Sequence, residues 1–312
     1  MKPVYVINGF LESGKTEFLL YTLDQPYFAI KGGTLLILCE EGEKEYSEKI
    51  LKSTGTTLVK LDDIAEFTKE HLEELDKKYK PERIIIEWNG MWDFRQFVMA
   101  KGWRMEQQIT TICAETFSVF FTNMRSLLAE QIRNSELMIF NRCDPNTMDL
   151  NKYKRNIKAV NQRADVVFED ENGEVDQIME DDLPYDMKAP VIELDDNGYA
   201  VWFLDIMDNM KRYEGKTISY IGQVMIPNRR DLSYCCVGRK AMTCCSQDIS
   251  FLAYACVYDK VKDLKEKDWV KVTAVVKNEF WKDYNEEGPV LHVKSIEPAK
   301  MPAGGDTLDL TK

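Results

Sequence analysis

The stretch that decides the fold covers residues 4–16 and reads Val4-Tyr5-Val6-Ile7-Asn8-Gly9-Phe10-Leu11-Glu12-Ser13-Gly14-Lys15-Thr16. A short β-branched run predicts a buried strand, the pattern Gly-x-x-x-x-Gly-Lys-Thr follows it, and residues 17–23 predict a helix. The two glycines let the backbone curl so that several N–H groups converge, and the helix N-terminus adds partial positive charge there. The stretch therefore predicts a phosphate-binding loop. The alternative is a loop of this shape that is kept only for the fold.

Within this loop each residue has an expected role. We expect the Lys15 ammonium to reach the β and γ phosphates of a nucleotide and the Thr16 hydroxyl to hold Mg²⁺. The remaining contacts to the nucleotide are expected from the loop backbone and the first helical turn, at Gly9, Glu12, Ser13, Gly14 and Glu17.

Three later strand candidates also end in polar residues. Residues 34–38 run into Glu40, and residues 83–86 run into Glu87, which Gly90 and Asp93 follow. Ligands of parallel sheets bind beyond the carboxyl ends of the strands. We therefore expect Glu40 and Glu87 in the shell of Mg²⁺ and its water, and residues 87–93 as the switch that senses the γ-phosphate through Gly90.

The last of these strands, residues 137–140, ends at Asn141-Arg142-Cys143-Asp144. A carboxylate at Asp144 can accept hydrogen bonds from the N1–H and N2–H₂ groups of guanine, whereas adenine offers no such pair of donors. We therefore expect Asn141, Arg142 and Asp144 to bind the guanine base of GTP. Strands that alternate with helices predict an α/β fold of the P-loop NTPase type, with a mostly parallel sheet.

These residues resemble the CobW/HypB/UreG group of P-loop GTPases, which deliver metals, and the CobW-type members in particular. Residues 8–16 look like the family's G-F-L-G-S-G-K-T loop, Glu40 and Gly42 fall where the family has N-E-F-G, and residues 87–93 look like E-T-S-G-L-A-D. Residues 141–144 look like N-K-x-D, and Gln131 precedes them as in the family. The resemblance implies Mg²⁺-dependent GTP hydrolysis that is coupled to metal delivery.

The chain departs from this family at three places. Residues 56–59 contain no cysteine where the family carries a C-x-C-C metal motif. Glu17 replaces a hydroxyl residue that touches the α-phosphate, and its charge repels phosphate unless the side chain turns outward. Arg142 replaces a lysine, and its guanidinium can stack on a base equally well.

From residue 215 onward the sequence pattern changes to about five short strand-like runs separated by turn residues. We expect domain boundaries at 1–195 for the GTPase domain, 196–214 for a linker helix, 215–300 for a small OB-like barrel, and 301–312 for a disordered tail. Residues 199–300 resemble the C-terminal domain of YcgQ-type proteins, which are encoded with permeases and linked to the zinc response. That resemblance rests mainly on residues 239–248.

Five of the eight cysteines are crowded into the barrel segment, at Cys235, Cys236, Cys244, Cys245 and Cys256. Neighbouring residues on a strand point to opposite faces, so regular strands would not bring all four paired cysteines to one metal. Two or three of these thiolates, with Cys256, Asp248 or His292 added, would make a zinc site. The alternative is that buried cysteines fill a small core.

The composition of the chain bears on its partners and its location in the cell. The net charge of −12 disfavours nucleic-acid binding, and without a long apolar run we expect no membrane insertion and a cytoplasmic location. Our leading hypothesis is a GTPase that uses GTP and Mg²⁺ and delivers a metal, zinc by preference, with dimerisation left open. The second is a non-catalytic interaction or sensor module that binds nucleotide and contacts a permease or a metal-dependent target.

Overall fold

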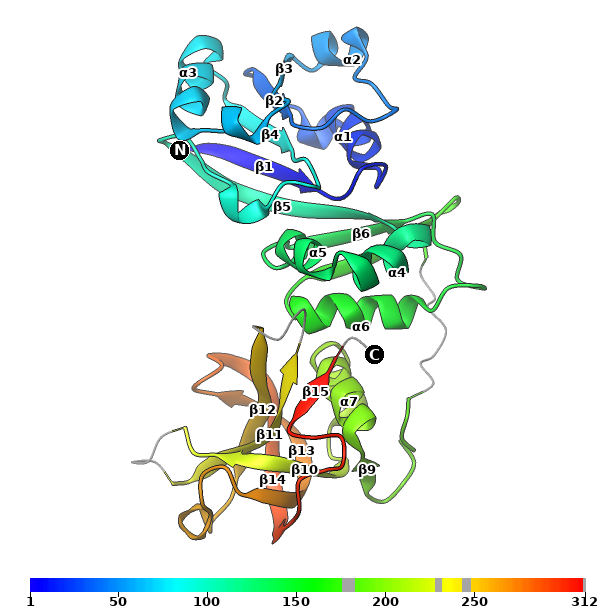
Figure 1. The fold of residues 1–312 in the computed structure, drawn as a ribbon, viewed down its shortest axis with the longest axis vertical. Helices are drawn as coiled ribbons and strands as arrows, with labels where there is room; N and C mark the ends of the chain where they lie inside the picture. Colours follow the sequence, from blue (N-terminus) through cyan, green and yellow to red (C-terminus); the bar gives the residue numbers. More distant parts are fainter. Residues whose placement is uncertain (176–182, 228–231, 243–247, 311–312) are drawn as a thin grey trace. The chain divides into compact units, whose positions relative to one another are not determined.

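The computed structural model describes residues 1–312 with the exception of 176–182, 228–231, 243–247 and 311–312 (Figure 1). The chain divides into two compact units, Met1–Met179 and Glu180–Lys312. In the described part of the chain, no helix has the length and apolar character that a membrane crossing requires.

The first unit is built on one sheet of eight strands in the order β3-β2-β4-β1-β5-β6-β7-β8 (Figure 1). All its pairings are parallel except that of β7 with β8. The strands are β1 (Lys2–Asn8), β2 (Thr34–Leu38), β3 (Thr56–Lys60), β4 (Arg83–Glu87), β5 (Trp103–Cys113), β6 (Leu137–Asn141), β7 (Asp165–Asp170) and β8 (Gly173–Glu174).

Helices connect these strands. They are α1 (Lys15–Leu23), α2 (Glu48–Ser53), α3 (Lys69–Tyr79), α4 (Ala114–Asn123), α5 (Arg125–Ile132) and α6 (Leu150–Val160), with short 3₁₀ turns η1 (Pro26–Phe28), η2 (Ile64–Glu66) and η3 (Phe94–Gln96). Every residue of β2 and β4 is buried, as expected for central strands of a parallel sheet that is covered on both faces.

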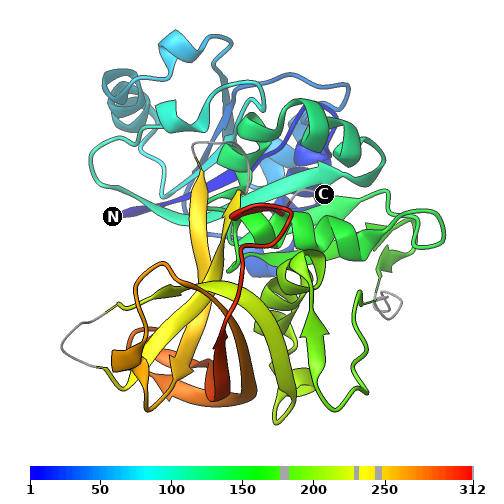
Figure 2. The same ribbon diagram turned by 60° about the horizontal axis from the view of Figure 1, so that its bottom comes forward.

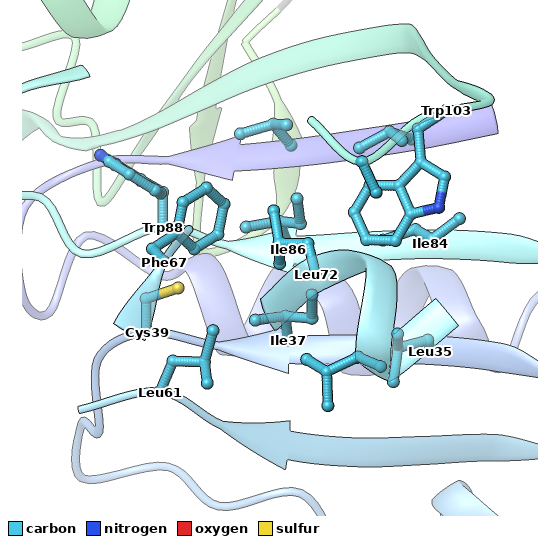
Figure 3. Packing of buried hydrophobic residues seen from close by; sticks show 14 residues of the cluster. Leu35, Ile37, Cys39, Leu61, Phe67, Leu72, Ile84, Ile86, Trp88 and Trp103 are labelled. Carbon is cyan, nitrogen blue, oxygen red and sulfur yellow. The ribbon is translucent and has the colours of Figure 1, made fainter. Parts of the chain in front are cut away.

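Alternation along β2 divides the core between those two faces. Leu35 and Ile37 pack in one cluster with Leu72 of α3 and with Trp88, as Figure 3 shows. Leu36, between them, packs on the opposite face in a second cluster that includes two leucines of α1. Burial on both faces fixes the register of the strands, because a shift by one residue would exchange the two clusters. The register pairs Ile7 of β1 with Glu87 of β4.

The second unit is a closed ring of strands. It contains β10 (Thr217–Met225), β11 (Tyr234–Met242), β12 (Ile249–Val257), β13 (Trp269–Trp281) and β14 (Glu286–Pro298), with the turn η4 (Val261–Asp263) before β13. The ring runs β10-β11-β12-β14-β13 and returns to β10, and only β12 and β14 pair in parallel within it (Figure 2). The fold class is therefore confirmed: a mostly parallel P-loop sheet precedes an all-β unit.

Segments expected outside the barrel belong to the second unit. Strand β9 (Ile192–Leu194) pairs with β10, and α7 (Asp196–Asp208) is followed by α8 (Met210–Tyr213). The Tyr199 hydroxyl of α7 donates to the Leu252 carbonyl (2.8 Å), and Trp202 lies against the ring of Tyr220. The unit therefore begins near residue 180, earlier than the predicted boundary at 195, and α7 packs on the barrel where we expected a linker.

The C-terminal segment also differs from the expectation of a disordered tail over 301–312. Residues Thr307–Asp309 form β15, which pairs in parallel with β11. The buried guanidinium of Arg239 on β11 binds the Asp196 carboxylate and donates to the Gly305 carbonyl at 2.9 Å. Arg239 of the barrel therefore contacts both α7, through Asp196, and the C-terminal segment, through Gly305.

Candidate nucleotide-binding site

The loop between β1 and α1 has the geometry that its glycines predict. Gly9 has a φ of +139°, and a Cβ there would lie 2.3 Å from Ser13 Oγ and 2.4 Å from the Thr111 carbonyl oxygen. Gly14 has a φ of +91° and caps α1, where a Cβ would lie 2.6 Å from Asn141 Nδ2. A side chain at either position would combine a positive φ with a collision against these neighbours, so glycine is required at both.

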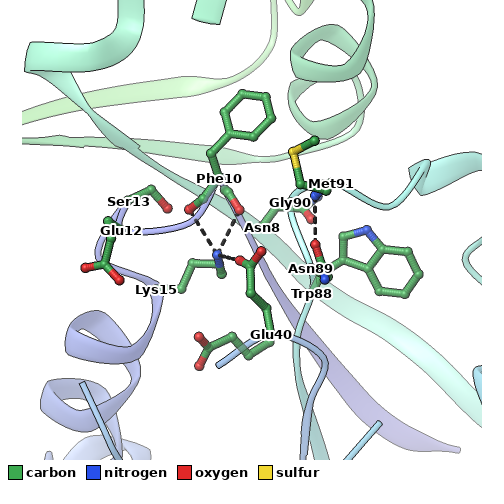
Figure 4. A network of polar contacts seen from close by, with 12 residues as sticks. Asn8, Phe10, Glu12, Ser13, Lys15, Glu40, Trp88, Asn89, Gly90 and Met91 are labelled. Carbon is green, nitrogen blue, oxygen red and sulfur yellow. Dashed lines mark hydrogen bonds and ion pairs between the residues drawn. The ribbon is translucent and has the colours of Figure 1, made fainter. Parts of the chain in front are cut away.

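The Lys15 ammonium lies at the centre of this loop (Figure 4). Its Nζ donates to the carbonyl oxygens of Gly9 (2.9 Å) and Phe10 (3.0 Å) and to Glu40 Oε2 (2.6 Å). The two charged side chains are only 4% and 10% exposed. The loop carbonyls therefore hold the Lys15 ammonium in the loop, where a phosphate would also bind. The Glu40 carboxylate neutralises the positive charge of Lys15.

Glu87 at the end of β4 faces Thr16 and the ring of Tyr46. Thr16 Oγ1 donates to Glu87 Oε1 at 2.8 Å, and the Tyr46 hydroxyl donates to Glu87 Oε2. Burial raises the pKa of the Glu87 carboxyl, although the two hydroxyl donors act in the opposite direction. Burial and the nearby Glu87 charge hold the pKa of Tyr46 well above its ordinary value, so Tyr46 acts as a donor.

The chemistry of this group fits Mg²⁺. Thr16 and Glu87 offer a hydroxyl and a carboxylate, both hard oxygen ligands, at the N-terminus of α1 and beside the Lys15 ammonium. A hydroxyl that donates its proton to Glu87 keeps its lone pairs for a cation. The residues predicted to hold Mg²⁺ therefore lie together and carry suitable atoms.

Residues 40–46, which we call the strap, follow β2 and cross the phosphate-binding loop. Besides the contacts of Glu40 and Tyr46, the Glu43 N–H donates to Glu12 Oε1 (3.1 Å). Glu12 itself has a φ of +60°, a left-handed conformation that non-glycine residues adopt at a cost and often at functional sites. The strap therefore contacts the loop at two places, through Glu40 at Lys15 and through Glu43 at Glu12.

Glu17, predicted to repel phosphate, points toward cations instead. Its carboxylate lies 3.5 Å from Lys44 Nζ of the strap and 4.0 Å from the Arg142 guanidinium, and its side chain is 54% exposed. Glu17 therefore still lines the cavity beside the loop, but solvent and the two cations screen its charge and lessen its repulsion of a phosphate.

A cavity of about 290 Å³ lies between the loop and the strap. From the predicted site it brings together Glu12, Gly14, Lys15, Thr16, Glu17, Glu40, Glu87 and Arg142. Its charged lining consists of five carboxylates, with Glu43 as the fifth, and three cations, with Lys44 as the third. A nucleotide with several negative charges would need a divalent cation to offset this excess of carboxylates.

Of the three predicted base-binding residues, Arg142 lines this cavity, whereas Asn141 and Asp144 do not. Asn141 Nδ2 donates to the Ser13 carbonyl (2.7 Å), and the Arg142 guanidinium donates to the Glu12 carbonyl (2.9 Å). Asp144 is further along the same turn, where its oxygens accept from the Asn146 N–H (3.0 Å) and the Thr147 hydroxyl (2.7 Å). These local donors lower the pKa of Asp144, so its carboxylate stays charged.

The two remaining residues of the predicted switch, Gly90 and Asp93, occupy different surroundings. Gly90 packs against the loop, since a Cβ there would lie 2.2 Å from the Gly9 carbonyl oxygen. Asp93 lies outside the cavity lining, caps η3, and binds Arg95 through both carboxylate oxygens. The structure therefore brings Gly90 to the phosphate-binding loop and leaves Asp93 in an exposed ion pair.

The predicted zinc ligands of the second unit are only partly described. Cys235 and Cys256 are opposite each other on β11 and β12 and are fully buried, whereas Cys236 is half-buried. Cys244 and Cys245 lie outside the described residues. Within the described ranges, no three His, Cys, Asp or Glu side chains are grouped to hold a metal, and His292 pairs with Glu279 instead (2.9 Å). A zinc site built from two or three of these thiolates stays a prediction.

Sequence reasoning missed the strap residues Glu43, Lys44 and Tyr46. Residues 43–52 have a charged, helical pattern, but the helix begins only at Glu48, and Tyr46 before it reaches a carboxylate 41 positions away. Only the carboxylate at the end of β4, which requires a donor when buried, hints that a polar partner exists.

Two protein-family models match the chain, one in each half. Residues 3–168 match the CobW/HypB/UreG nucleotide-binding domain, and residues 170–305 match the domain of unknown function DUF1980, C-terminal part. Two solved structures are similar at low identity. The hydrogenase maturation factor HypB from Archaeoglobus fulgidus is 15% identical, with a TM-score of 0.39, 54% of this chain covered and 81% of that one.

The second structure is a zinc-bound triple mutant of the GTPase YjiA. It is 14% identical, with a TM-score of 0.38, 95% of this chain covered and 89% of that one. No curated protein matches the chain. The family model spans more than half of the sequence and includes the loop, the strap and all three predicted base-binding residues. The chain therefore belongs to the CobW/HypB/UreG family of nucleotide-binding domains.

Proposed function

We propose that this protein binds Mg²⁺-GTP and hydrolyses it, and that hydrolysis is coupled to the delivery of a metal, zinc by preference. The observation that carries the proposal is the buried group of Lys15, Thr16 and Glu87 at the N-terminus of α1. A lysine, a hydroxyl and a carboxylate in this arrangement match the needs of a magnesium-bound triphosphate.

In this proposal the chain's own residues position the nucleotide and stabilise its charge. Lys15 and the loop N–H groups would bind the β and γ phosphates, and Thr16 and Glu87 would hold the magnesium ion. Bound Mg²⁺ would neutralise charge on the phosphate oxygens. Glu40 would move from Lys15 as phosphate enters, and its carboxylate would then be available to orient the attacking water. Asp93, in its exposed pair with Arg95, would act only through the movement of the switch.

We assign guanine as the base because Asp144 keeps a charged carboxylate at the end of the segment that begins with Asn141. Each carboxylate oxygen has more than one lone pair, so the local donors Asn146 and Thr147 leave capacity for the N1–H and N2–H₂ groups of guanine.

The test is a calorimetric titration of the natively purified protein with Mg²⁺-GTP and Mg²⁺-ATP, with the metal content measured on the same sample. We expect GTP to bind, ATP to bind far more weakly, and Lys15→Ala to lose GTP binding and turnover. The matched control is Lys52→Ala, whose side chain is 78% exposed and outside the cavity lining, and which should leave GTP affinity unchanged. Equal GTP affinity in the wild type and Lys15→Ala would refute the site.

A second candidate is a non-catalytic interaction or sensor module, and one observation favours it. Strand β3 contains no cysteine where related proteins carry their metal motif, so the first unit lacks those metal ligands. In this role the nucleotide would only set the conformation of the switch, while the barrel contacts a permease or a metal-dependent target in the cytoplasm. GTP turnover that Lys15→Ala abolishes would argue against this candidate.

The proposed zinc delivery has a separate test in the second unit. Zinc retained after native purification, and lost in a Cys244→Ser and Cys245→Ser double variant, would support a zinc site that includes the barrel cysteines. Full thermal stability in chelator, without bound zinc in the purified protein, would refute that site and leave Cys235 and Cys256 as core residues.

A further inference from the structure

Gln131, near the C-terminal end of α5, is fully buried and its side-chain amide reaches the switch. Its Nε2 donates to the Gly90 carbonyl oxygen over 2.7 Å, although 41 positions separate the two residues. A buried hydrogen bond of this kind fixes the direction of the peptide group that accepts it. The orientation of the Gly90 carbonyl is therefore set from a helix that is remote from the switch in sequence.

The carbonyl in question belongs to a backbone segment that touches the phosphate-binding loop. A Cβ on Gly90 would lie 2.2 Å from the Gly9 carbonyl oxygen and 2.7 Å from Phe10 Cα, so the two backbones are in direct contact. Figure 4 shows Gly90 and Met91 beside Asn8 and Phe10 at this point. A rotation of the Gly90 peptide would change which backbone groups the switch presents to the end of a bound triphosphate.

The main chain of Gln131 is itself held firmly. Its carbonyl oxygen accepts hydrogen bonds from Asn8 Nδ2 (3.4 Å), Gln108 Nε2 (3.0 Å), Thr110 Oγ1 (3.1 Å) and Ser135 Oγ (2.9 Å). All five residues are at most 2% exposed. This network anchors the base of the side chain on β1, β5 and α5, so the amide is presented to Gly90 from a rigid support.

The same amide has an acceptor that the described residues leave without a partner. Gln131 Oε1 is buried and receives no hydrogen bond there. The peptide group that joins Gly90 to Met91 has its carbonyl bound to Gln131. Its N–H, which belongs to Met91, points away from Gln131 and donates to Asn89 Oδ1 at 2.8 Å. If that peptide reversed, its N–H would face Gln131, and a half turn of the amide would present Oε1 to it. Gln131 can therefore satisfy either orientation of the Gly90 peptide.

We propose that Gln131 is a positioning residue that sets the Gly90 peptide and thereby makes the site distinguish a nucleoside triphosphate from a diphosphate. The inference rests on the proposed GTP binding and extends it to a residue that does not touch the nucleotide. GTP and GDP share every contact except those to the γ-phosphate, so a residue that acts through the switch alters the affinity for GTP and leaves that for GDP unchanged.

The test measures affinities for Mg²⁺-GDP and for a non-hydrolysable Mg²⁺-GTP analogue by calorimetry, in the wild type and in two variants. Gln131→Met keeps the length of the side chain and removes the amide. Gln131→Asn keeps an amide but is too short to reach Gly90, and it decides the question if the methionine variant does not fold. The matched control is Ser135→Ala, which removes a donor to the Gln131 carbonyl and leaves the amide in place.

We expect both Gln131 variants to lose roughly tenfold in affinity for the GTP analogue at unchanged GDP affinity, and Ser135→Ala to keep the wild-type ratio of the two. Equal losses for both nucleotides would show a merely structural role and overturn the inference, as would an unchanged ratio. A wild type that binds neither nucleotide would refute the proposed function itself, which is a distinct result.

Discussion

The Lys15 ammonium and the Glu40 carboxylate form a buried ion pair with 2.6 Å between Nζ and Oε2, at the position where a nucleotide phosphate would bind. A phosphate that enters this position competes with Glu40 for the same cation. Nucleotide binding must therefore break the ion pair, because the buried Lys15 ammonium exchanges Glu40 for the phosphate. The free energy that the pair contributes weakens nucleotide binding by the same amount.

Replacing Glu40 by glutamine tests this competition. Glu40→Gln keeps the shape of the side chain and removes its charge, so we expect about tenfold tighter binding of GDP in the presence of a magnesium chelator. Calorimetric titration measures it. The control is Glu41→Gln, whose side chain is 57% exposed and paired with Lys60, and which should leave GDP affinity unchanged. Identical affinities of Glu40→Gln and the wild type would contradict the competition.

Tyr46 is expected to set the magnesium requirement, because its hydroxyl orients one oxygen of Glu87 while Thr16 orients the other. Tyr46→Phe keeps the ring and removes the donor. We expect the Mg²⁺ concentration for half-maximal GTP binding to rise about three- to tenfold, with a stability loss of about 1 kcal/mol. Tyr21→Phe, on the exposed face of α1, is the control. An unchanged magnesium dependence in Tyr46→Phe would mean that Glu87 is oriented without it.

The Glu87 carboxyl should make the metal-free protein less stable as the pH rises. Its pKa is raised by burial above the usual 4.5, so between these two values the folded protein binds more protons than the unfolded chain. Stability then falls as the pH rises through that interval and levels off above the folded-state pKa.

The variant Glu87→Gln lacks this titration. The difference in melting temperature between Glu87→Gln and the wild type, measured in chelator, should therefore grow in favour of the variant as the pH rises above the usual carboxyl pKa of 4.5. Differential scanning calorimetry over this range measures it. Parallel stability curves for the two proteins would show that burial of Glu87 has little energetic cost.

The ion pair of Arg239 and Asp196 should stabilise the second unit. Arg239 is 1% exposed, so Asp196→Asn leaves a buried guanidinium with a neutral partner, and we expect a loss of about 1–3 kcal/mol in the free energy of unfolding. The matched control is Asp306→Asn, whose partner Lys240 is 44% exposed, with an expected loss below about 1 kcal/mol. Urea unfolding of the full chain measures both, and equal losses would contradict this role of Arg239.

The sequence predicts the phosphate-binding loop because its signals are local. Gly9 and Gly14 stand where the backbone needs positive φ, and the strand before them and the helix after them have short-range patterns. The position of Glu87 follows from a more general rule, since the carboxyl ends of neighbouring parallel strands meet at one edge. These two signals were enough to predict the group of Lys15, Thr16 and Glu87.

Contacts that depend on tertiary packing alone could not be predicted in this way. The amphipathic pattern of α7 indicates a helix, but it does not reveal that Tyr199 reaches a carbonyl of β12. Residues 307–309 follow two glycines and have little strand character, so their strand forms because β11 offers an edge to pair with. The contact of Tyr46 with Glu87 belongs to the same class.

Asn141 and Arg142 hold the phosphate-binding loop by its outward-facing carbonyls, those of Ser13 and Glu12. The conformational entropy of the loop is therefore lost when the chain folds, before any nucleotide arrives, and the association step need not include that cost. A loop fixed in this way also cannot release its ligand by melting.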